Sequence, residues 1–341
     1  MTAVADARLP GGTNDSWPSL LRAYADRLLV FAVSKDRNAK AVVLLFDEGR
    51  ADPVMVAKVP TTVVAQQQVC AEFGALVRIR DRLTGDLRRT VPEPVQLLSH
   101  DGCPILLMSA VPGASGLARY HGWRHTSRRA GVRADLDAAA TWLTAFQTAT
   151  ATRVQPVDLL GAVADRLAER FGNDDSIDDV IARIPLLRHR MGRCRSPRTA
   201  EHGDYWFGNL LFGGGQVSGV IDWEMALPTD GEPARDLARF FVSYSLYLDR
   251  HASRRGHVRG HDFRAVRWGD GVRYAVNGDG WYPSLARAFL RTGLHRLGMP
   301  AERGREVVLA ELLTVAAQAD DEEFARQHLR LFRDLSDDGR R

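Results

Sequence analysis

The spacing of apolar residues changes once along this chain, near Pro112 and Gly113, and that change limits the folds open to it. Before this point, short apolar runs alternate with polar, turn-forming segments, a pattern that predicts β-strands. The runs are residues 28–33, 41–46, 54–59, 95–98 and 105–108. Residues 66–83 differ from them, because their apolar side chains recur at helical spacing. We therefore expect an antiparallel β meander with one inserted helix.

After Gly113, apolar residues recur mostly at intervals of three and four, which predicts helices. The helical stripes lie at 136–146, 159–171, 180–184, 285–290, 307–315 and 324–335. A short β-hairpin near 210–222 interrupts them, and residues 250–282 have no clear periodicity, which predicts a long loop or insertion. The expected fold class is α+β: a small antiparallel β lobe, residues 1–110, and a larger, mainly helical lobe, residues 111–341.

Composition excludes several classes of protein. The 341 residues are 45% hydrophobic and 26% charged, as in ordinary globular proteins. No apolar run approaches the roughly 20 residues that span a bilayer, and the N-terminus lacks the pattern of a signal peptide. Cys70, Cys103 and Cys194 are few and far apart, so neither a disulfide framework nor a structural zinc site is expected. These features together predict a cytoplasmic protein without a membrane partner.

The basic residues give little support for nucleic-acid binding. The net charge is only +4, the charges alternate along most of the chain, and no nucleic-acid-binding motif is present. Three basic segments stand out: 119–133, 188–198 and 250–264. They are expected to be solvated arginine, although an anionic or sugar-phosphate acceptor or a nucleic acid stays open for them. We expect His251, His257 and His261 to lie at the surface without a metal.

The segment 201–224 places several polar side chains together. Two apolar runs, 210–212 and 217–221, flank the glycine-rich tip 213–216, so they should pair as a hairpin. Pairing brings Asn209, at one end of the hairpin, beside Asp222 at the other. Both then lie next to the loop that holds Asp204.

This grouping suits phosphoryl transfer. Hard oxygen ligands that leave room for water and phosphate oxygens are those Mg²⁺ prefers. Phosphoryl transfer requires a metal clamp, a positioned nucleophile and cationic groups on the phosphates. An aspartate in the loop, an asparagine five residues later and a second aspartate across the hairpin are the parts of a kinase site.

The motifs resemble those of the aminoglycoside phosphotransferase and choline kinase-like family. His202-Gly203-Asp204 with Asn209 is similar to its catalytic loop, and Ile221-Asp222-Trp223-Glu224 to its metal-binding segment. The family's Asp-Leu-Ala follows as 236–238. The resemblance implies a protein-kinase-like bilobal fold, with ATP as co-substrate and Mg²⁺ as cofactor. It makes Asp204 the base or hydroxyl orienter, and Asn209 and Asp222 the metal ligands.

Supporting roles follow from the same resemblance. His202 would orient the loop and Asp236 would anchor it by hydrogen bonds. Glu224 would reach the metal or one of the groups around it, an alternative that the sequence leaves open. The stretch Val54-Met-Val-Ala-Lys58-Val resembles the kinase strand whose lysine contacts the α- and β-phosphates. Glu72, 14 residues later on the predicted helix, suits the glutamate that pairs with this lysine.

The remaining nucleotide contacts are less specific. Residues 108–113 resemble the family hinge, which suggests Ser109 and Val111 for the adenine edge through their backbone groups. The first hairpin loop has no glycine, so the phosphate cradle G-x-G-x-x-G is absent. Ser34, Arg37 or Asn38 would take its place, and GTP stays open as an alternative to ATP.

The expected reaction moves the γ-phosphoryl group to a hydroxyl of a small polar molecule. An antibiotic-inactivating kinase, for an aminoglycoside or a macrolide, and a metabolic sugar or amino-alcohol kinase are both open. The acidic clusters 174–179 and 320–323 are expected to be solvated, or to lie at helix N-termini, rather than to bind a polycation. A protein acceptor is disfavoured, because no activation segment ends in A-P-E. A non-catalytic nucleotide-binding relative is the remote alternative, and the oligomeric state stays open.

Overall fold

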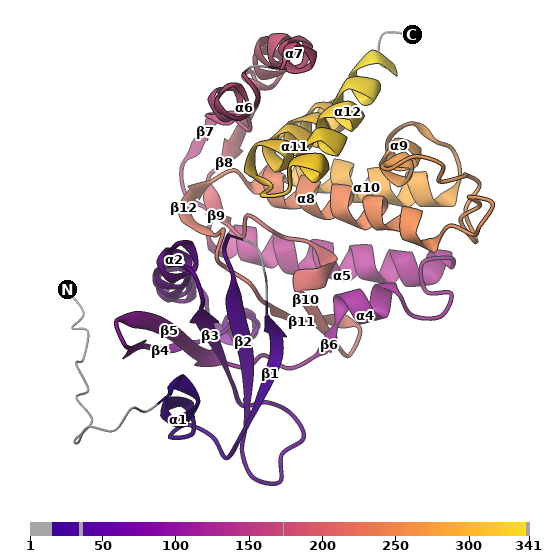
Figure 1. The fold of residues 1–341 in the computed structure, drawn as a ribbon. Helices are drawn as coiled ribbons and strands as arrows, with labels where there is room; N and C mark the ends of the chain where they lie inside the picture. The colour runs from indigo at the N-terminus through magenta and orange to yellow at the C-terminus, as the bar shows by residue number, and fades with distance from the viewer. Residues whose placement is uncertain (1–15, 34–36, 173, 339–341) are drawn as a thin grey trace. The chain divides into compact units, whose positions relative to one another are not determined.

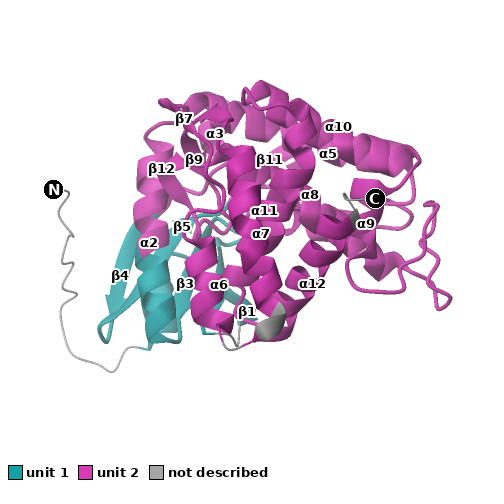
Figure 2. Ribbon diagram, turned by 90° about the horizontal axis from the view of Figure 1, so that it is seen from above, with its two compact units in different colours: residues 1–70, 95–110 teal, residues 71–94, 111–341 magenta. Residues whose placement is uncertain are grey.

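The structure, a computed structural model, describes residues 16–33, 37–172 and 174–338. It divides into two compact units, which Figure 2 shows in different colours. Unit 1 is the described part of Met1–Cys70 together with Val95–Ala110. Unit 2 is the described part of Ala71–Pro94 and Val111–Arg341. Each unit is described separately below.

Unit 1 is built on an antiparallel sheet of five strands, in the order β1-β2-β3-β5-β4. The strands are β1 (Arg27–Val33), β2 (Lys40–Phe46), β3 (Met55–Pro60), β4 (Pro94–His100) and β5 (Cys103–Ser109). The expected strands are all present, but the expected meander is wrong, since β5 lies between β3 and β4. Burial gives the reason: the apolar run Ile105–Met108 of β5 is buried, whereas β4 is largely half-buried or exposed and suits an edge.

The core of unit 1 lies on one face of this sheet. Val43 and Leu45 of β2 pack there with buried residues of β3 and β5. A short helix, α1 (Trp17–Leu21), contributes Leu21, and Trp17 and Leu20 pack against the cluster. This cluster fixes the position of β3, the strand that carries Lys58.

The predicted inserted helix is α2 (Val63–Arg80), and it is followed by the short α3 (Gly85–Arg89). The division between the units falls within α2, after Cys70. Glu72 therefore belongs to unit 2, although Lys58 belongs to unit 1.

Unit 2 is mainly helical, as the periodicity predicted. Its helices are α4 (Gly116–Tyr120), α5 (Arg129–Ala149), α6 (Val163–Phe171), α7 (Asp175–Met191), α8 (Pro233–Leu246), α9 (Asp270–Asn277), α10 (Trp281–Arg296), α11 (Gly304–Gln318) and α12 (Glu322–Asp338). Figure 1 shows α8 and α10 between α5 on one side and α11 with α12 on the other. Every residue from Val307 to Ala316 in α11 is buried, as expected for a helix enclosed by others.

Short strands join these helices. The predicted hairpin is β10 (Leu210–Gly213) and β11 (Gln216–Val220), with β6 (Ala114–Ser115) on its edge. Two further ribbons pair β9 (Thr199–Glu201) with β12 (Leu227–Gly231), and β7 (Val154–Pro156) with β8 (Arg195–Pro197). The segment between β9 and β12 contains all the motif residues from His202 to Glu224.

The expectation of a long loop over 250–282 is partly wrong. This stretch contains α9 and the start of α10, and two isolated β-bridges hold the part before them. His257 is exposed as expected, but His261 is buried. Its Nε2 lies 2.8 Å from the Thr126 carbonyl, and its ring packs against Trp281 and Tyr282. Apolar contacts distant in sequence thus account for a histidine that local sequence placed at the surface.

Candidate active site

The loop that begins at His202 is fixed by a buried carboxylate from α8. The two oxygens of Asp236 accept hydrogen bonds from the backbone N–H groups of His202, at 2.8 Å, and Gly203, at 3.0 Å. Gly203 has a φ of 80°, and a side chain there would collide with the carbonyl of Met225. The expected anchoring role of Asp236 is therefore seen in the structure. It gives the loop a single path, with Asp204 at its turn.

The imidazole of His202 links this loop to the other end of the hairpin. Its Nε2 lies 3.0 Å from the carbonyl oxygen of Ile221, and its Nδ1 accepts the backbone N–H of Asp204 at 3.2 Å. With Nδ1 as acceptor, Nε2 carries the proton. His202 is fully buried, so it orients the loop and does not face solvent.

A layer of aromatic rings supports the same segment. Trp142 of α5 stacks on Tyr205, with ring centroids 5.4 Å apart, and Trp223 packs against His202 at 4.5 Å. The buried polar atoms of these rings are satisfied, since Trp223 Nε1 donates to the Val220 carbonyl and Tyr205 Oη to the Ala139 carbonyl. The motif residues are therefore supported by tightly packed side chains.

Asp204 and Asn209 are joined directly. The carboxamide nitrogen of Asn209 donates to the backbone carbonyl of Asp204 and to its Oδ2, both at 3.0 Å. Because the nitrogen is used in this way, the carboxamide oxygen is the atom of Asn209 suited to a metal. The short 3₁₀ helix η1 (Phe207–Asn209) carries Asn209 to the start of β10.

The hairpin brings Asp222 to Asn209, as its sequence predicted. The N–H of Ile221 donates to the Asn209 carbonyl at 3.0 Å, and Leu210 pairs with Val220 in the register of the two strands. Asp222 itself has a φ of 66°, the left-handed conformation that aspartate and asparagine tolerate better than most residues. The turn at Asp222 ends the strand and directs the chain into Trp223 and Glu224.

Three carboxylates converge at this turn. One oxygen each from Glu72, Asp222 and Glu224 lie within 4.8 Å of one another. Glu72 is anchored there by the N–H of Trp223, which donates to its Oε1 at 3.1 Å. These three carboxylates are an all-oxygen set of hard ligands, and such a set fits Mg²⁺. The backbone of Asn209 adjoins this turn through the N–H of Ile221. The pairing of Glu72 with Lys58 expected from the sequence stays a prediction.

The other predicted nucleotide contacts are distributed over both units. Lys58 is 5% exposed on β3, opposite Val42 on one side and Leu106 on the other. Ser109 ends β5 in unit 1, and Val111 follows in unit 2, half-buried. Ser34 lies outside the described residues. Lys58 and Ser109 thus belong to unit 1, and Val111 belongs to the same unit as the Asp204 loop.

Two residues of this site were missed by sequence reasoning. Arg239 of α8 lies beside Asp204, with its Nε and Nη2 each 2.8 Å from Oδ1. Its Nη1 reaches Oε1 of Glu311 in α11 at 3.2 Å. Arg239 follows Asp236 by three residues, so helical spacing put it on the same face of α8. No local signal marks Glu311, which is 72 residues further along the chain.

Buried carboxyl groups surround the loop. Burial raises the pKa of Glu201 and of Glu311 to about 7 each, although nearby arginines oppose the shift. Burial also raises the pKa of Asp236 well above its ordinary value, and the charge of Glu201 adds to the effect. For Arg239, the carboxylates of Asp204 and Glu311 raise the pKa despite burial, which alone would lower it.

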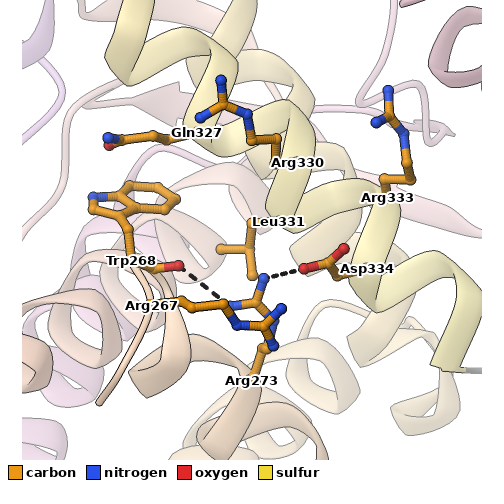
Figure 3. A pocket seen from close by; sticks show the side chains of 8 residues that line it. All are labelled: Arg267, Trp268, Arg273, Gln327, Arg330, Leu331, Arg333 and Asp334. Atoms are coloured by element: carbon orange, nitrogen blue, oxygen red, sulfur yellow. Dashed lines mark hydrogen bonds and ion pairs between the residues drawn. The ribbon is translucent and has the colours of Figure 1, made fainter. Parts of the chain in front are cut away.

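A separate cavity of about 390 Å³ lies between Arg267, Trp268 and Arg273 on one side and α12 on the other (Figure 3). Arg330 and Arg333 also line it, but in the view they extend away from Arg273. Its guanidinium groups have carboxylate partners: Arg273 contacts Asp270 and Asp334, Arg267 Asp270, Arg330 Glu323 and Arg333 Asp179. The arginines that line this cavity are therefore all engaged in ion pairs, and Asp204 is not among the lining residues.

Comparison with known proteins identifies the family of this chain. A model of the phosphotransferase enzyme family matches residues 36–268. The chain belongs to this family. A comparison with curated protein sequences found no match. The family match confirms the resemblance drawn from the motifs and the expected class of enzyme, a small-molecule phosphotransferase.

Solved structures agree on the fold. A thermostable mutant of aminoglycoside phosphotransferase APH(4)-Ia, in ternary complex with AMP-PNP and hygromycin B, is similar with a TM-score of 0.57 and 16% identity, over 92% of this chain and 95% of that one. The streptomycin–ATP–APH(2″)-IIa ternary complex gives a TM-score of 0.50 and 13% identity, over 93% and 94%. The expected kinase-like fold is thus confirmed. Among the residues with described positions, no helix is long and apolar enough to cross a membrane.

Proposed function

We propose that this phosphotransferase uses MgATP to phosphorylate a hydroxyl group of a small polar molecule. One observation carries the proposal: Asp204, Asn209 and Asp222 meet at the base of one hairpin, where Glu72 and Glu224 complete an all-oxygen set. A purely structural role does not call for so many convergent carboxylates. A divalent cation that carries a nucleotide would bind to such a set of carboxylates.

In this proposal, Asn209 and Asp222 hold Mg²⁺, and Glu224 is a further ligand or binds a water molecule on the metal. The bound metal neutralises negative charge on the β- and γ-phosphates. Lys58 contacts the α- and β-phosphates and is oriented by Glu72, and the backbone at Ser109 and Val111 contacts the base. Residues 1–110 then serve as the nucleotide-binding lobe and 111–341 as the lobe that binds the acceptor.

Asp204 acts on the acceptor. Its carboxylate takes a hydrogen bond from the acceptor hydroxyl and receives the proton as the oxygen bonds to the γ-phosphorus and ADP leaves. Oδ1 faces Arg239, and Oδ2 accepts a single hydrogen bond from Asn209, so the second lone pair of Oδ2 is available to the hydroxyl. The three cysteines are unpaired, as a reducing cytoplasm would keep them, and we place the reaction there.

The following experiment identifies the class of acceptor. Both solved relatives described above contain an aminoglycoside, which makes an antibiotic acceptor a natural first trial. ADP release from MgATP is measured with separate pools of aminoglycosides, macrolides, sugars, amino alcohols and nucleosides, and with Asp222→Asn as the blank. A pool that raises ADP release only with the wild-type protein supports the proposal and names the class. Failure to bind or hydrolyse MgATP, and likewise MgGTP, would overturn it.

A further inference from the structure

Arg239 of α8 lies against the carboxylate of Asp204, the proposed base. Its Nε donates to Oδ1 of Asp204 at 2.8 Å, and Nη2 lies at the same distance from that oxygen. Asn209 donates to the other oxygen, Oδ2, at 3.0 Å. Both oxygens of the carboxylate are thus held from different directions, so rotation about its side-chain bonds is restricted.

Glu311 holds Arg239 from the far side. Its Oε1 lies 3.2 Å from Nη1 of Arg239, and its side chain is only 4% exposed. The guanidinium group therefore bridges two carboxylates, one on the loop and one on α11. Since a planar guanidinium offers its donors in a fixed fork, the position of Glu311 sets the angle at which Nε and Nη2 meet Asp204.

We propose that Arg239 is a positioning residue for phosphoryl transfer: it fixes the Asp204 carboxylate through Oδ1, so that Oδ2 meets the acceptor hydroxyl, and Glu311 holds Arg239 in place. This inference rests on the proposed function. In the reaction, the acceptor oxygen bonds to the γ-phosphorus, the bond from phosphorus to the leaving ADP oxygen breaks, and the hydroxyl proton passes to Oδ2. Arg239 itself neither binds the nucleotide nor exchanges a proton.

The expected effect of losing Arg239 is on turnover and not on nucleotide binding. Without it, Asp204 keeps only its bond with Asn209 and can rotate away from the hydroxyl. A small misplacement of a reacting group costs about 10²-fold in rate. Arg239→Gln should therefore lower kcat about 10²-fold and leave the Kd for MgATP within about twofold. Arg239→Lys keeps the positive charge but loses the forked donors of the guanidinium group. Its kcat should therefore lie between that of the wild type and that of Arg239→Gln.

The experiment measures ADP release from MgATP with water as acceptor, and calorimetric binding of MgATP, for the wild type and each variant. Glu311→Gln is a second test that leaves Arg239 and Asp204 in the chain, and it should lower kcat about tenfold by loosening the guanidinium group. Arg287→Gln is the matched control. Arg287 of α10 is half-buried like Arg239 and donates to the carbonyls of Ala275, Val276 and Gly278, with no contact to Asp204 or Glu311, so its loss should leave kcat unchanged.

A double-mutant cycle separates positioning from general structural damage. If Arg239 acts only through Asp204, then adding Arg239→Gln to Asp204→Asn should lower kcat no further. Multiplying effects would overturn the inference, as would Arg239→Gln with wild-type kcat, or Asp204→Asn with wild-type turnover. A wild-type protein without any turnover or nucleotide binding would instead overturn the proposed function itself.

Discussion

The N–H of Ile221 donates a hydrogen bond to the carbonyl of Asn209, 3.0 Å away, and so closes the hairpin at its base. The bond joins the end of the Asp204 loop to the start of the acidic turn, although the two residues are 12 positions apart along the chain. Because backbone groups make it, the proximity of Asn209 and Asp222 does not depend on their own side chains. Substitution of the Asp222 side chain can therefore be interpreted as a chemical change rather than a structural one.

Asp222→Asn should abolish turnover and leave the fold intact. The amide lacks the negative charge that holds a divalent cation, yet asparagine tolerates the left-handed φ of 66° at least as well as aspartate. We expect a loss of about 10³-fold or more in ADP release, by analogy with removal of other major electrostatic groups. Circular dichroism and the thermal midpoint should match the wild type. Retained activity would contradict the metal assignment of Asp222.

Glu224→Gln tests the third carboxylate separately. If Glu224 is a ligand or binds a metal-bound water, its loss weakens Mg²⁺ binding, and the concentration of Mg²⁺ at half-maximal rate should rise about tenfold or more. Excess Mg²⁺ should restore much of the rate, in contrast to Asp222→Asn. The measurement is an activity titration with Mg²⁺ at fixed, saturating ATP. An unchanged Mg²⁺ requirement would leave Glu224 a purely structural part of the turn.

Lys58→Met should weaken the interaction with ATP. Loss of one charge-assisted hydrogen bond to a phosphate costs about 1.5–3 kcal/mol, which lowers kcat/KM about ten- to a hundredfold. If Glu72 serves by orienting Lys58, Glu72→Gln should cost little more in the Lys58→Met background. If Glu72 instead holds the metal, the two losses should multiply. Steady-state kinetics of the two single variants and the double variant distinguish these roles.

Gly203→Ala should destabilise unit 2 and impair turnover together. An alanine at a φ of 80° costs about 1–3 kcal/mol, and the methyl group would also collide with the Met225 carbonyl. The urea midpoint should fall accordingly. Gly214→Ala is the control, since Gly214 has a φ of 58° but open space around it. The prediction fails if both variants lose the same stability and Gly203→Ala remains fully active.

Glu201→Gln should stabilise the protein at alkaline pH. Burial raises the pKa of Glu201 to about 7, so the folded state keeps a proton that the unfolded state loses near 4.5. Stability from this group is therefore present at low pH and is lost as the pH rises through about 7. The glutamine side chain does not ionise, so the variant does not lose this stability as the pH rises. The free energy of unfolding of Glu201→Gln at pH 8 should exceed that of the wild type by on the order of 1–3 kcal/mol. Urea unfolding at pH 5.5 and pH 8 measures it, and a difference independent of pH would refute it.

Local pattern was sufficient for much of this molecule. The five strands of unit 1, the helical stripes named for unit 2 and the hairpin at 210–222 follow from spacing, because each depends on residues near in sequence. The helices α8 and α9 and the ribbons β9–β12 and β7–β8 were not predicted. Partners far apart in sequence were not accessible in the same way. The insertion of β5 between β3 and β4 depends on which strand buries the more apolar face, and His261 is buried by rings of α10.

The same limit explains what was missed at the site. Arg239 could be placed on the face of α8 that carries Asp236, but its contact with Asp204 requires knowing where the loop lies. Glu311 contributes through a helix pairing, α8 with α11, that no local motif encodes. Nothing in the sequence separates Glu72 as a partner of Lys58 from Glu72 as a neighbour of Asp222.

The buried carboxyl groups under the loop also change how the whole protein carries charge. The formal net charge of +4 counts every acid as ionised and every histidine as neutral. Burial raises the pKa of Glu201 and of Glu311 to about 7, whereas burial lowers the pKa of His261 and of His328 to about 4. The net charge at pH 7 is then higher than the formal value. In these four groups the usual order of titration is inverted, so carboxylic acids buffer near neutrality where imidazoles ordinarily would.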